Sequence, residues 1–401
     1  MAEEDEMLEE EFSVWKKNTP FLYDLLLSHP LQWPSLTVHC FPSSPLPYSL
    51  NPSFNLHKLL FATHTADNVP NFLIVADALL PSSNSQPDPL NPVIPNIQIT
   101  QKILVDGEVN RARSMPQNSN IIGAKTSGSD VYVFDTSKQL EKEGLECQPD
   151  LRLKGHDKEG YGLSWSPFKE GHLLSASYDH KICLWDVSAP QHNVLHALHT
   201  YQAHESVVND VSWHLRDHNL FGSVGDDSKL IIWDSRTNQP HNSLIAHDKE
   251  VNFLSFNPYN EWVLATASSD STIGLFDTRK LTVPLHVLSS HTDEVFQVEW
   301  DPNHETVLAS SGADRRIMVW DLNRVGDEQL EGDGDDGPPE LLFSHGGHKG
   351  KISDFSWNKN QPWVISSVAE DNSFHVWKMA ESIYHDGDGD DDEIWTVDEQ
   401  H

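Results

Sequence analysis

The stretch that decides the fold is "GHDKEGYGLSWSPFKEGHLLSASYDHKICLWD", residues 155–186. In it, His156 is followed by an aromatic residue nine positions on, a serine at nineteen, an aspartate at twenty-three and a second aromatic residue at twenty-nine. The stretch ends in "ICLWD" (182–186), a short apolar run with the pattern of a half-buried strand. Polar residues at fixed distances within strand-forming sequence indicate one unit of a repeat.

The same register recurs four more times. The five sets are His156/Trp165/Ser175/Asp179/Trp185, His204/Trp213/Ser223/Asp227/Trp233, His247/Phe256/Thr266/Asp270/Phe276, His291/Trp300/Ser310/Asp314/Trp320 and His348/Trp357/Ser367/Asp371/Trp377. Repeats of roughly 40–45 residues with this ending are typical of WD-type β-propellers, in which each blade has four strands. Five matches at four fixed offsets make this a specific signal.

Further segments complete the ring. "VYVFD" (131–135) ends a degenerate repeat, because "VDGEVNRARSM" (105–115) stands where its histidine and aromatic residue should fall. "NFLIVADALL" (71–80) predicts a strand of a seventh blade. "SLTVHCFP" (35–42) predicts the strand that pairs with the C-terminal blade, and such closure protects the sheet edges.

We therefore expect an all-β fold, a seven-bladed WD-repeat β-propeller with an N-terminal α-helix docked on its side. Residues 1–34 would form the acidic N-terminus and this helix, and residues 35–380 the propeller. An acidic proline loop is inserted at 324–343. Residues 381–401 would hold the start of a C-terminal helix and an acidic tail.

The N-terminal region is expected to be helical in two parts. Phe12 and Trp15 are three apart on one helical face. Thr19 and Pro20 have the pattern of an N-cap followed by proline at the first helical position. The apolar residues that follow, which include Leu25, would then form the face that docks on the propeller. Whether this helix leaves a groove stays open.

His, Ser and Asp together can suggest a hydrolase triad. Five copies of one constellation instead indicate a structural network. In it, an aspartate in a tight turn bonds the histidine ring, and the hydroxyl and an indole N–H extend the chain of bonds. We expect no enzymatic activity.

No cofactor or metal is expected either. A phosphate-binding loop and a dinucleotide fingerprint are absent from the sequence. "DGDGDDDEIW" (386–395) is similar to a calcium loop, but Asp391 and Val397 stand where such a loop needs Gly and Glu. Cys40, Cys147 and Cys183 have no metal-type spacing, which fits a reducing compartment.

The charge points to a basic protein partner. The net charge is −34, which argues against nucleic acid or an anionic membrane as the direct ligand, because phosphate binding needs a positive surface. Acidic runs without a base lie at 3–11, 327–340 and 381–401. The start of the chain lacks an apolar signal core, and no apolar run approaches the roughly 18 residues of a membrane span. We expect a soluble, intracellular protein.

The loop "GDGDDGPPELLF" (332–343) is the first candidate site. Asp333, Asp335 and Asp336 offer negative charge, the prolines stiffen the chain, and the sequence ends in the apolar residues 341–343. Charge beside an apolar shelf suits a basic amphipathic helix laid in a groove.

A ring of acids at equivalent repeat positions is the second. Glu159, Glu250 and Glu294 follow their repeat histidines by three residues, and Asp226 and Glu370 precede the network aspartates. Equivalent positions in a propeller surround one mouth of the channel. Carboxylates there could hold Arg or Lys of an extended tail, and Tyr161 and Phe296, five residues after their histidines, could stack on a guanidinium.

"LIIWDSR" (230–236) is a third feature. Trp233, Asp234 and Arg236 resemble the box by which some propellers dock on the adaptor of cullin ubiquitin ligases. An alternative function is therefore that of a substrate receptor of such a ligase.

Longer motifs resemble one family. They are "WKKNTPFLYDLL" (15–26), "WPSLT" (33–37), "GEVNRARSMPQ" (107–117), "DEVFQVEW" (293–300), "ASSGADRRIMVWDL" (309–322) and "DGPPELLFSHGGHKGKISDFSWN" (336–358). They are similar to the retinoblastoma-associated histone-binding propellers, the p55-type or multicopy-suppressor-of-Ira family. The resemblance spans roughly residues 9–384.

The resemblance implies two binding sites and a set of partners. The first helix of histone H4 would lie between the N-terminal helix and the proline loop, held by Phe21, Leu22, Asp333, Asp335, Asp336, Phe343 and Ile383. The channel mouth would receive a histone H3-type basic tail through Trp33, Pro34, Glu108, Asn110, Arg111, Glu159, Tyr161, Asn209, Asp226, Glu250, Glu294, Phe296 and Glu370. Partners would be histones and the chromatin assembly factor, deacetylase and Polycomb-type complexes of the nucleus.

The sequence departs from the family pattern at four positions. Gln32 and Asn209 stand where a glutamate is common, and Gly332 and Ser344 replace an acid and an apolar residue beside the loop.

Overall fold

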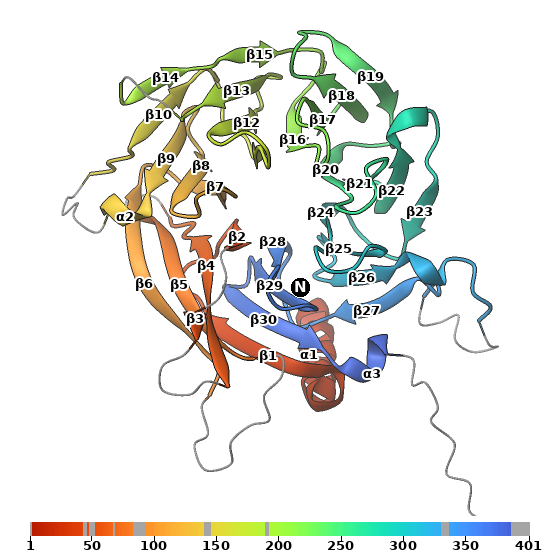
Figure 1. The fold of residues 1–401 in the computed structure, drawn as a ribbon. Coiled ribbons are helices and arrows are strands. Elements are labelled where there is room, and N and C mark those ends of the chain that lie inside the picture. Colours follow the sequence, from red (N-terminus) through yellow and green to blue (C-terminus); the bar gives the residue numbers. More distant parts are fainter. Residues whose placement is uncertain are drawn as a thin grey trace, which may run out of the picture.

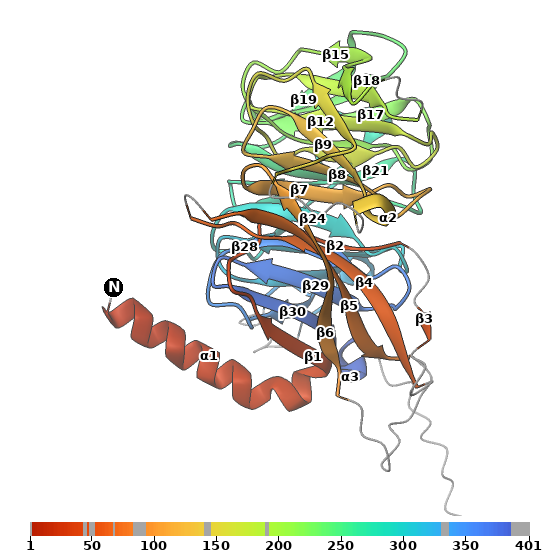
Figure 2. The same ribbon diagram turned by 90° about the vertical axis from the view of Figure 1, so that its left-hand side faces the viewer.

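Seven sheets surround a central channel in the computed structural model, one for each blade (Figure 1). The structure describes residues 2–42, 46–47, 53–66, 69–82, 94–139, 146–188, 192–329 and 337–385. The expected fold class is confirmed, and the N-terminal helix lies along the side of the ring (Figure 2).

The first three blades are built from residues 38–201. From the channel outward, the first contains β2 (Val38–Cys40), β4 (Phe54–Ala62), β5 (Asn71–Pro81) and β6 (Asn96–Val105), with β3 (Leu46–Pro47) paired to β4. The second contains β7 (Val109–Ser114), β8 (Ile121–Thr126), β9 (Val131–Asp135) and β10 (Leu151–Lys154), and β14 (Val194–His196) joins β10 in parallel. The third contains β11 (Leu163–Trp165), β12 (His172–Ala176), β13 (Ile182–Asp186) and β15 (His199–Tyr201).

The next three blades are regular four-stranded meanders. The fourth contains β16 (Val208–Trp213), β17 (Leu220–Gly225), β18 (Lys229–Asp234) and β19 (Pro240–Ile245). The fifth contains β20 (Val251–Phe256), β21 (Val263–Ser268), β22 (Thr272–Asp277) and β23 (His286–Ser289). The sixth contains β24 (Val295–Trp300), β25 (Val307–Gly312), β26 (Ile317–Asp321) and β27 (Leu341–His345).

The seventh blade closes the ring, but not with the expected segment. It contains β28 (Ile352–Trp357), β29 (Val364–Ala369) and β30 (Ser373–Met379), and its outer strand is β1 (Tyr23–Pro30). β1 runs antiparallel to β30, with Leu26 opposite Trp377. Residues 35–42, predicted to close the ring, instead supply β2, the innermost strand of the first blade. The prediction was wrong because the apolar residues of β1 have a spacing that also suits a helix.

The N-terminal helix is one element, not two. α1 (Ala2–Leu22) continues through Pro20, so the prediction that a helix begins at Thr19 was wrong. Pro20 has no N–H to donate to the Lys16 carbonyl. The Thr19 hydroxyl donates to that carbonyl at 2.9 Å instead, which satisfies the acceptor that the proline leaves open.

The remaining helices are short: α2 (Thr136–Gln139), the 3₁₀ turns η1 (Thr278–Lys280) and η2 (Leu322–Arg324), and α3 (Glu381–Tyr384). In the part of the chain that the structure describes, no helix combines the length and apolar composition that a membrane crossing needs. Cys40, Cys147 and Cys183 are buried and free.

The core is divided into seven clusters, one at each contact between neighbouring blades. For example, Leu174 of the third blade packs with Trp213 of the fourth. Both faces of each sheet are therefore buried, which explains why the strands are nearly continuous apolar runs.

The repeat residues form the expected polar network in four blades. His156, His204, His247 and His291 place Nδ1 at 3.1, 2.9, 3.0 and 2.8 Å from their aspartates, and Nε2 at 2.7–2.8 Å from the repeat hydroxyl. Each aspartate also accepts the N–H two residues on, across a turn whose middle residue has positive φ. The aspartate thus fixes both a tight turn and the histidine.

The fifth copy differs from the expectation. His348 Nδ1 lies 2.5 Å from the Ser373 hydroxyl rather than on Asp371. Ser373 in turn donates to Asp371, because a hydroxyl two residues after the aspartate can stand between the two groups. In the fifth blade the Phe276 ring has no N–H, so that copy also lacks the expected indole bond.

Candidate functional site

The first candidate surface is built where α1 meets the seventh blade. The Leu22 carbonyl, at the end of α1, accepts the Ala380 N–H at 2.9 Å. Asp24 Oδ2 lies 3.2 Å from Lys378 Nζ and accepts the Glu381 N–H at 3.1 Å. The end of α1, the start of β1 and the start of α3 are therefore held together.

α1 carries an exposed apolar stripe on its outer face. Met7, Val14 and Phe21 are 64, 51 and 79% exposed. They are spaced by seven residues and so lie on one side of the helix. Met7 and Val14 line a groove of about 560 Å³ between α1 and β27, which Ser344 borders from the strand side. The helix therefore does leave a groove.

The opposite face of α1 anchors it to the ring. The Trp15 indole donates to the Tyr23 hydroxyl at 2.9 Å. Lys349 Nζ lies 2.6 Å from Glu9 and 4.4 Å from the centre of the Phe12 ring. Glu11 pairs with Arg316 at 3.3 Å. Glu10, at the groove, stays exposed.

The four apolar residues predicted for this site lie at three depths. Phe21 is exposed, whereas Leu22 and Ile383 are half-buried against the cluster of Tyr23 and Trp377. Phe343 is only 7% exposed and belongs to that cluster. Its predicted place in the wall is corrected, because alternation along β27 turns Phe343 inward and Ser344 outward.

The acids predicted in the proline loop, Asp333, Asp335 and Asp336, lie outside the described residues, as does Gly332. The end of the loop is fixed. Gly337 adopts φ +107°, which favours glycine. Glu340 is buried with its carboxylate 3.0 Å from His286 Nε2, so this acid is structural.

The second candidate site is one mouth of the channel, where β-bulges aim side chains inward. The register of the innermost strands shifts at Asn110, Asn209, Asn252, Phe296 and Ser353. The last four lie five residues after a repeat histidine, as does Tyr161. All five residues at that offset line a pocket of about 290 Å³. Bulges commonly re-aim side chains at binding sites.

The asparagines also tie the blades together. Asn209 Nδ2 donates to the Val251 carbonyl at 3.0 Å, and Asn252 Nδ2 to the Val295 carbonyl at 2.8 Å. With the amide nitrogens used in this way, the amide oxygens remain as acceptors at the pocket.

The predicted acids of the mouth fall into two groups. Glu108 lies 3.0 Å from His64, Glu159 accepts from Asn110 at 3.2 Å, and Asp226 accepts from Asn209 at 2.8 Å. Glu250, Glu294 and Glu370 are exposed and form no ion pair among the described residues. The second group is therefore available to a cationic ligand.

Sequence reasoning missed several residues of this pocket and placed others there that do not line it. Leu36, Tyr178, Asn252 and Ser353 line the pocket, and burial raises the pKa of Tyr178 to about 12. The five-residue offset of Tyr161 and Phe296, applied to every repeat, would have found Asn252 and Ser353. Trp33 and Pro34 are half-buried beside it, where the Pro34 carbonyl accepts the His64 N–H at 2.8 Å. Gln32 is exposed.

Arg111 is held across the channel rather than offered to solvent. Its Nη1 lies 3.1 Å from Asp210 and its guanidinium 4.8 Å from the centre of the Phe253 ring. A cation also approaches the mouth aromatic Phe296, because Lys351 Nζ lies 6.0 Å from its centre. That ring can therefore receive positive charge.

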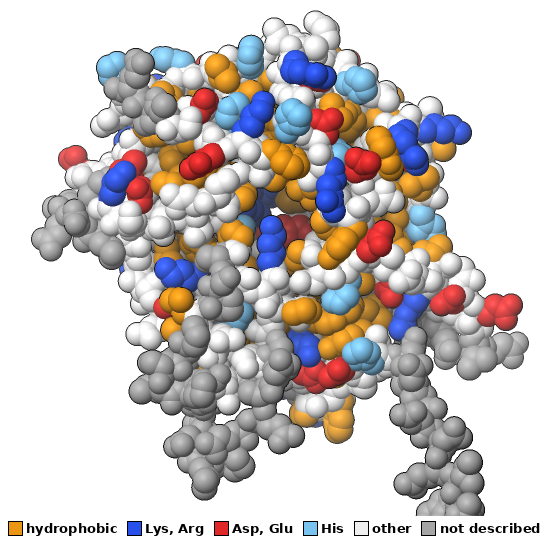
Figure 3. All heavy atoms as spheres, viewed as in Figure 1, with side chains coloured by type: hydrophobic (Ala, Val, Ile, Leu, Met, Phe, Trp, Pro, Cys, Tyr) orange, Lys and Arg blue, Asp and Glu red, His pale blue; other side chains and the backbone are white. Residues whose placement is uncertain are grey.

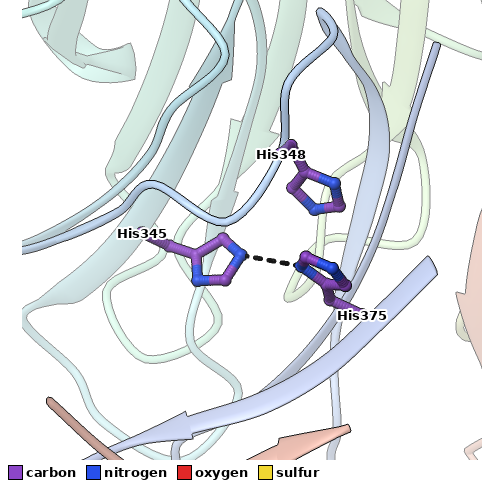
Figure 4. A group of neighbouring side chains, drawn as sticks. All are labelled: His345, His348 and His375. Carbon is purple, nitrogen blue, oxygen red and sulfur yellow. Dashed lines mark hydrogen bonds between the residues drawn. The ribbon is translucent and has the colours of Figure 1, made fainter. Parts of the chain in front are cut away.

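Three buried histidines meet beneath α1 (Figure 4). His345 Nε2 lies 3.2 Å from His375 Nδ1. The rings of His348 and His375 stack 4.2 Å apart at 21°, so their in-plane lone pairs cannot converge well on one metal ion. Burial lowers the pKa of His375 to about 4 and those of His345 and His348 well below their usual value. The cluster is thus a neutral, hydrogen-bonded part of the core.

The three residues of the possible adaptor box lie at different depths. Trp233 is fully buried and donates to Ser223 at 2.8 Å. Arg236 is exposed, and its guanidinium is paired with Asp234 at 2.5 Å.

Comparisons with known proteins agree with this architecture. Residues 10–82 match the family of the histone-binding protein RBBP4, which is described as also including a component of the CAF1 complex. Residues 147–186, 196–234, 238–277, 282–321 and 339–378 match the "WD domain, G-beta repeat". The "WD-40 repeat-containing protein MSI3" of Arabidopsis thaliana is 63% identical over 391 residues, which cover 96% of this chain and 92% of that protein.

Proposed function

This chain belongs to the RBBP4- and MSI-type family of histone-binding WD-repeat proteins, and we propose that it binds histones at two separate sites. The side groove holds the first helix of histone H4, between α1 and the proline loop. The channel mouth holds a basic tail of the histone H3 type. The protein acts as a non-enzymatic, chaperone-type subunit of nuclear chromatin complexes.

The apolar stripe on α1 is the observation that carries the first site. Met7, Val14 and Phe21 present about two heptads of apolar surface beside the groove, with exposed Glu10 at its edge. An amphipathic helix that buries its apolar face there would bring its basic flanks to the acids of α1 and of the loop at 332–336.

Substitution of the stripe tests this site. We expect Met7→Asn/Val14→Asn to weaken binding of a histone H4 first-helix peptide at least about tenfold, which is about 1.4 kcal/mol. Val283→Asn/Leu285→Asn is the matched control, because both residues are exposed apolar side chains far from α1 in the chain. Equal affinity of the two double variants would contradict the proposal.

The unpaired carboxylates and the five-residue offset support the second site. Glu250, Glu294 and Glu370 surround a pocket that also offers two aromatic rings and two amide oxygens. Such a set suits the Arg and Lys side chains of an extended peptide through charge-assisted bonds. Glu250→Gln/Glu294→Gln should lower the affinity for a histone H3 tail peptide. Glu305→Gln, which removes an exposed acid elsewhere on the ring, should not.

The partners proposed are those expected of the family: chromatin assembly factor, deacetylase and Polycomb-type complexes. Co-purification of the tagged chain from nuclear extract, followed by identification of its partners, tests this assignment. Partners limited to complexes without a chromatin role would contradict it.

Docking on a cullin-ligase adaptor is a second candidate function. Arg236 is exposed in a fixed orientation, because Asp234 holds its guanidinium. Arg236→Ala should abolish capture of the adaptor if the box is used. Arg279→Ala is the control, because Arg279 has the same pairing with Asp277 in the next blade.

A further inference from the structure

The channel has a second cavity at the end opposite to the mouth. The innermost strands begin at the mouth and end here, and the residues at and just after their ends line a space of about 590 Å³. Figure 3 faces this end of the ring and shows a hollow at its centre, with charged side chains inside and hydrophobic ones around it. Arg111 borders both spaces.

The aromatic residues nine positions after the repeat histidines form the wall of this cavity. Trp165, Phe256, Trp300 and Trp357 line it. Three indole N–H groups donate to backbone carbonyls of the preceding blade, from Trp165 to Arg113 at 2.9 Å, from Trp300 to Ser255 at 3.0 Å and from Trp357 to Glu299 at 3.2 Å. The wall is therefore rigid before any ligand arrives.

Exposed apolar side chains extend this wall onto the outer surface. Phe168, Leu215, Tyr259 and Trp262 stand on the loops that follow the innermost strands of three successive blades. Hydrogen bonds join these loops, from His214 Nε2 to the Glu261 carbonyl and from the Tyr259 hydroxyl to the Pro302 carbonyl, both at 2.8 Å. A contiguous apolar rim of this kind marks an interaction site.

The charges in the cavity differ from those of the rest of the molecule. Arg113 is paired with Asp354 through two bonds of 3.0 and 3.1 Å, and Arg111 neutralises Asp210. Lys359 is exposed at the rim and forms no ion pair among the described residues. Burial raises the pKa of Glu299 to about 7, so this acid is partly neutral. The lining is close to neutral or slightly positive in a chain of net charge −34.

Two groups in the cavity can still donate hydrogen bonds. Arg111 Nε is buried and has no partner within the described part of the chain, and the Lys359 ammonium faces solvent at the rim. A buried donor without a partner is costly, and an acceptor supplied by a ligand would satisfy it. A carboxylate answers both the free donor and the free cation.

We propose that this cavity is a second peptide site, which takes a partner segment with an aromatic or aliphatic side chain beside carboxylates. The apolar side chain packs on the tryptophan wall and the exposed rim. A carboxylate accepts from Arg111 and pairs with Lys359. The two ends of one channel would then select opposite charge, with basic peptides at the mouth and acidic ones here. This proposal does not rest on histone binding.

A pair of capped peptides tests the charge preference. We expect "DDDEIW" to bind and its charge-reversed twin "KKKKIW" not to bind at this end. Lys359→Glu should weaken binding of the acidic peptide by about tenfold or more, whereas Lys102→Glu, on the outer strand β6, should leave it unchanged. Both lysines are exposed, so neither change removes a core contact.

The chain carries an acidic segment with a tryptophan of its own, at 390–395. The titration is therefore run on the full chain and on a chain ending at His385, from which this competitor is missing. Binding by either form that is lost with Lys359→Glu supports the proposal. No binding by both forms, equal binding of the two peptides, or self-association of the chain that Lys359→Glu abolishes would overturn it.

Discussion

The hydroxyl of Tyr23 lies 2.7 Å from Nδ1 of His345. Tyr23 is the first residue of the ring-closing strand β1, and His345 is the last residue of β27 in the neighbouring blade. The same hydroxyl accepts the Trp15 indole N–H of α1, and His345 continues to His375 of β30. One chain of hydrogen bonds therefore joins the helix that borders the groove to the closure of the ring.

Tyr23→Phe should destabilise the protein through two lost partners. Both the Trp15 N–H and His345 Nδ1 would be left without the hydroxyl, and a buried polar group without a partner costs about 1–3 kcal/mol. We expect the free energy of unfolding to fall by about 2 kcal/mol in urea titrations. Tyr259→Phe, which removes an exposed hydroxyl, should change it by less than about 0.5 kcal/mol. Equal effects of the two changes would contradict this role of Tyr23.

The histidine cluster predicts a loss of stability in mild acid. Burial lowers the pKa of His375 to about 4, below its usual 6.5, so the unfolded chain binds more protons over this interval. Its stabilisation is complete above pH 6.5 and is lost as the pH falls towards 4, by roughly 3 kcal/mol for this ring alone. His345, near Arg316, and His348 act in the same direction.

The network aspartates act at lower pH, which separates the two effects. The pKa of Asp314 is lowered from 3.8 by its bond to His291 despite burial, so its contribution is lost only below that value. Urea midpoints at pH values of about 7 and about 4.5 test the histidines. His375→Gln, whose amide can still bond to His345, should reduce the drop between them, and exposed His218→Gln should not. A drop that is the same in both variants would contradict the assignment.

Ser373 should matter in its blade as much as a network residue does. It stands between His348 and Asp371, so Ser373→Ala leaves His348 Nδ1 without a partner. We expect a loss of about 1–3 kcal/mol in the free energy of unfolding. The control is Ser344→Ala on the exposed face of β27. A neutral Ser373→Ala would mean that the aspartate can bond the histidine directly, as it does in the other four blades.

The repeat register predicted the blades well because it records local contacts. The histidine, hydroxyl, aspartate and aromatic residues of one set bond to one another within a single blade, so their spacing is fixed by one supersecondary unit. The mouth follows the same logic: the position five residues after the histidine is bulged into the channel in successive blades.

The closure of the ring depends on contacts that local patterns do not contain. The spacing of the apolar residues 25–27 suits a helical face, but β30, whose residue Trp377 lies opposite Leu26, makes them a strand. Pro20 has the pattern of a helix start, yet the helix runs through it because Thr19 compensates its missing hydrogen bond. Apolar character alone misplaces Phe343, because the alternation along its strand decides which way the ring points. Met7 and Val14 were overlooked although their spacing with Phe21 is a heptad.

The most direct measurement is a calorimetric titration of a histone H4 first-helix peptide into the wild type and Asp333→Asn/Asp336→Asn, at low and high salt. The account predicts clear wild-type binding that weakens as salt rises, because exposed charge pairs are screened, and a marked loss of affinity in the double variant. Undetectable wild-type binding, or an affinity that neither salt nor the double substitution changes, would contradict it.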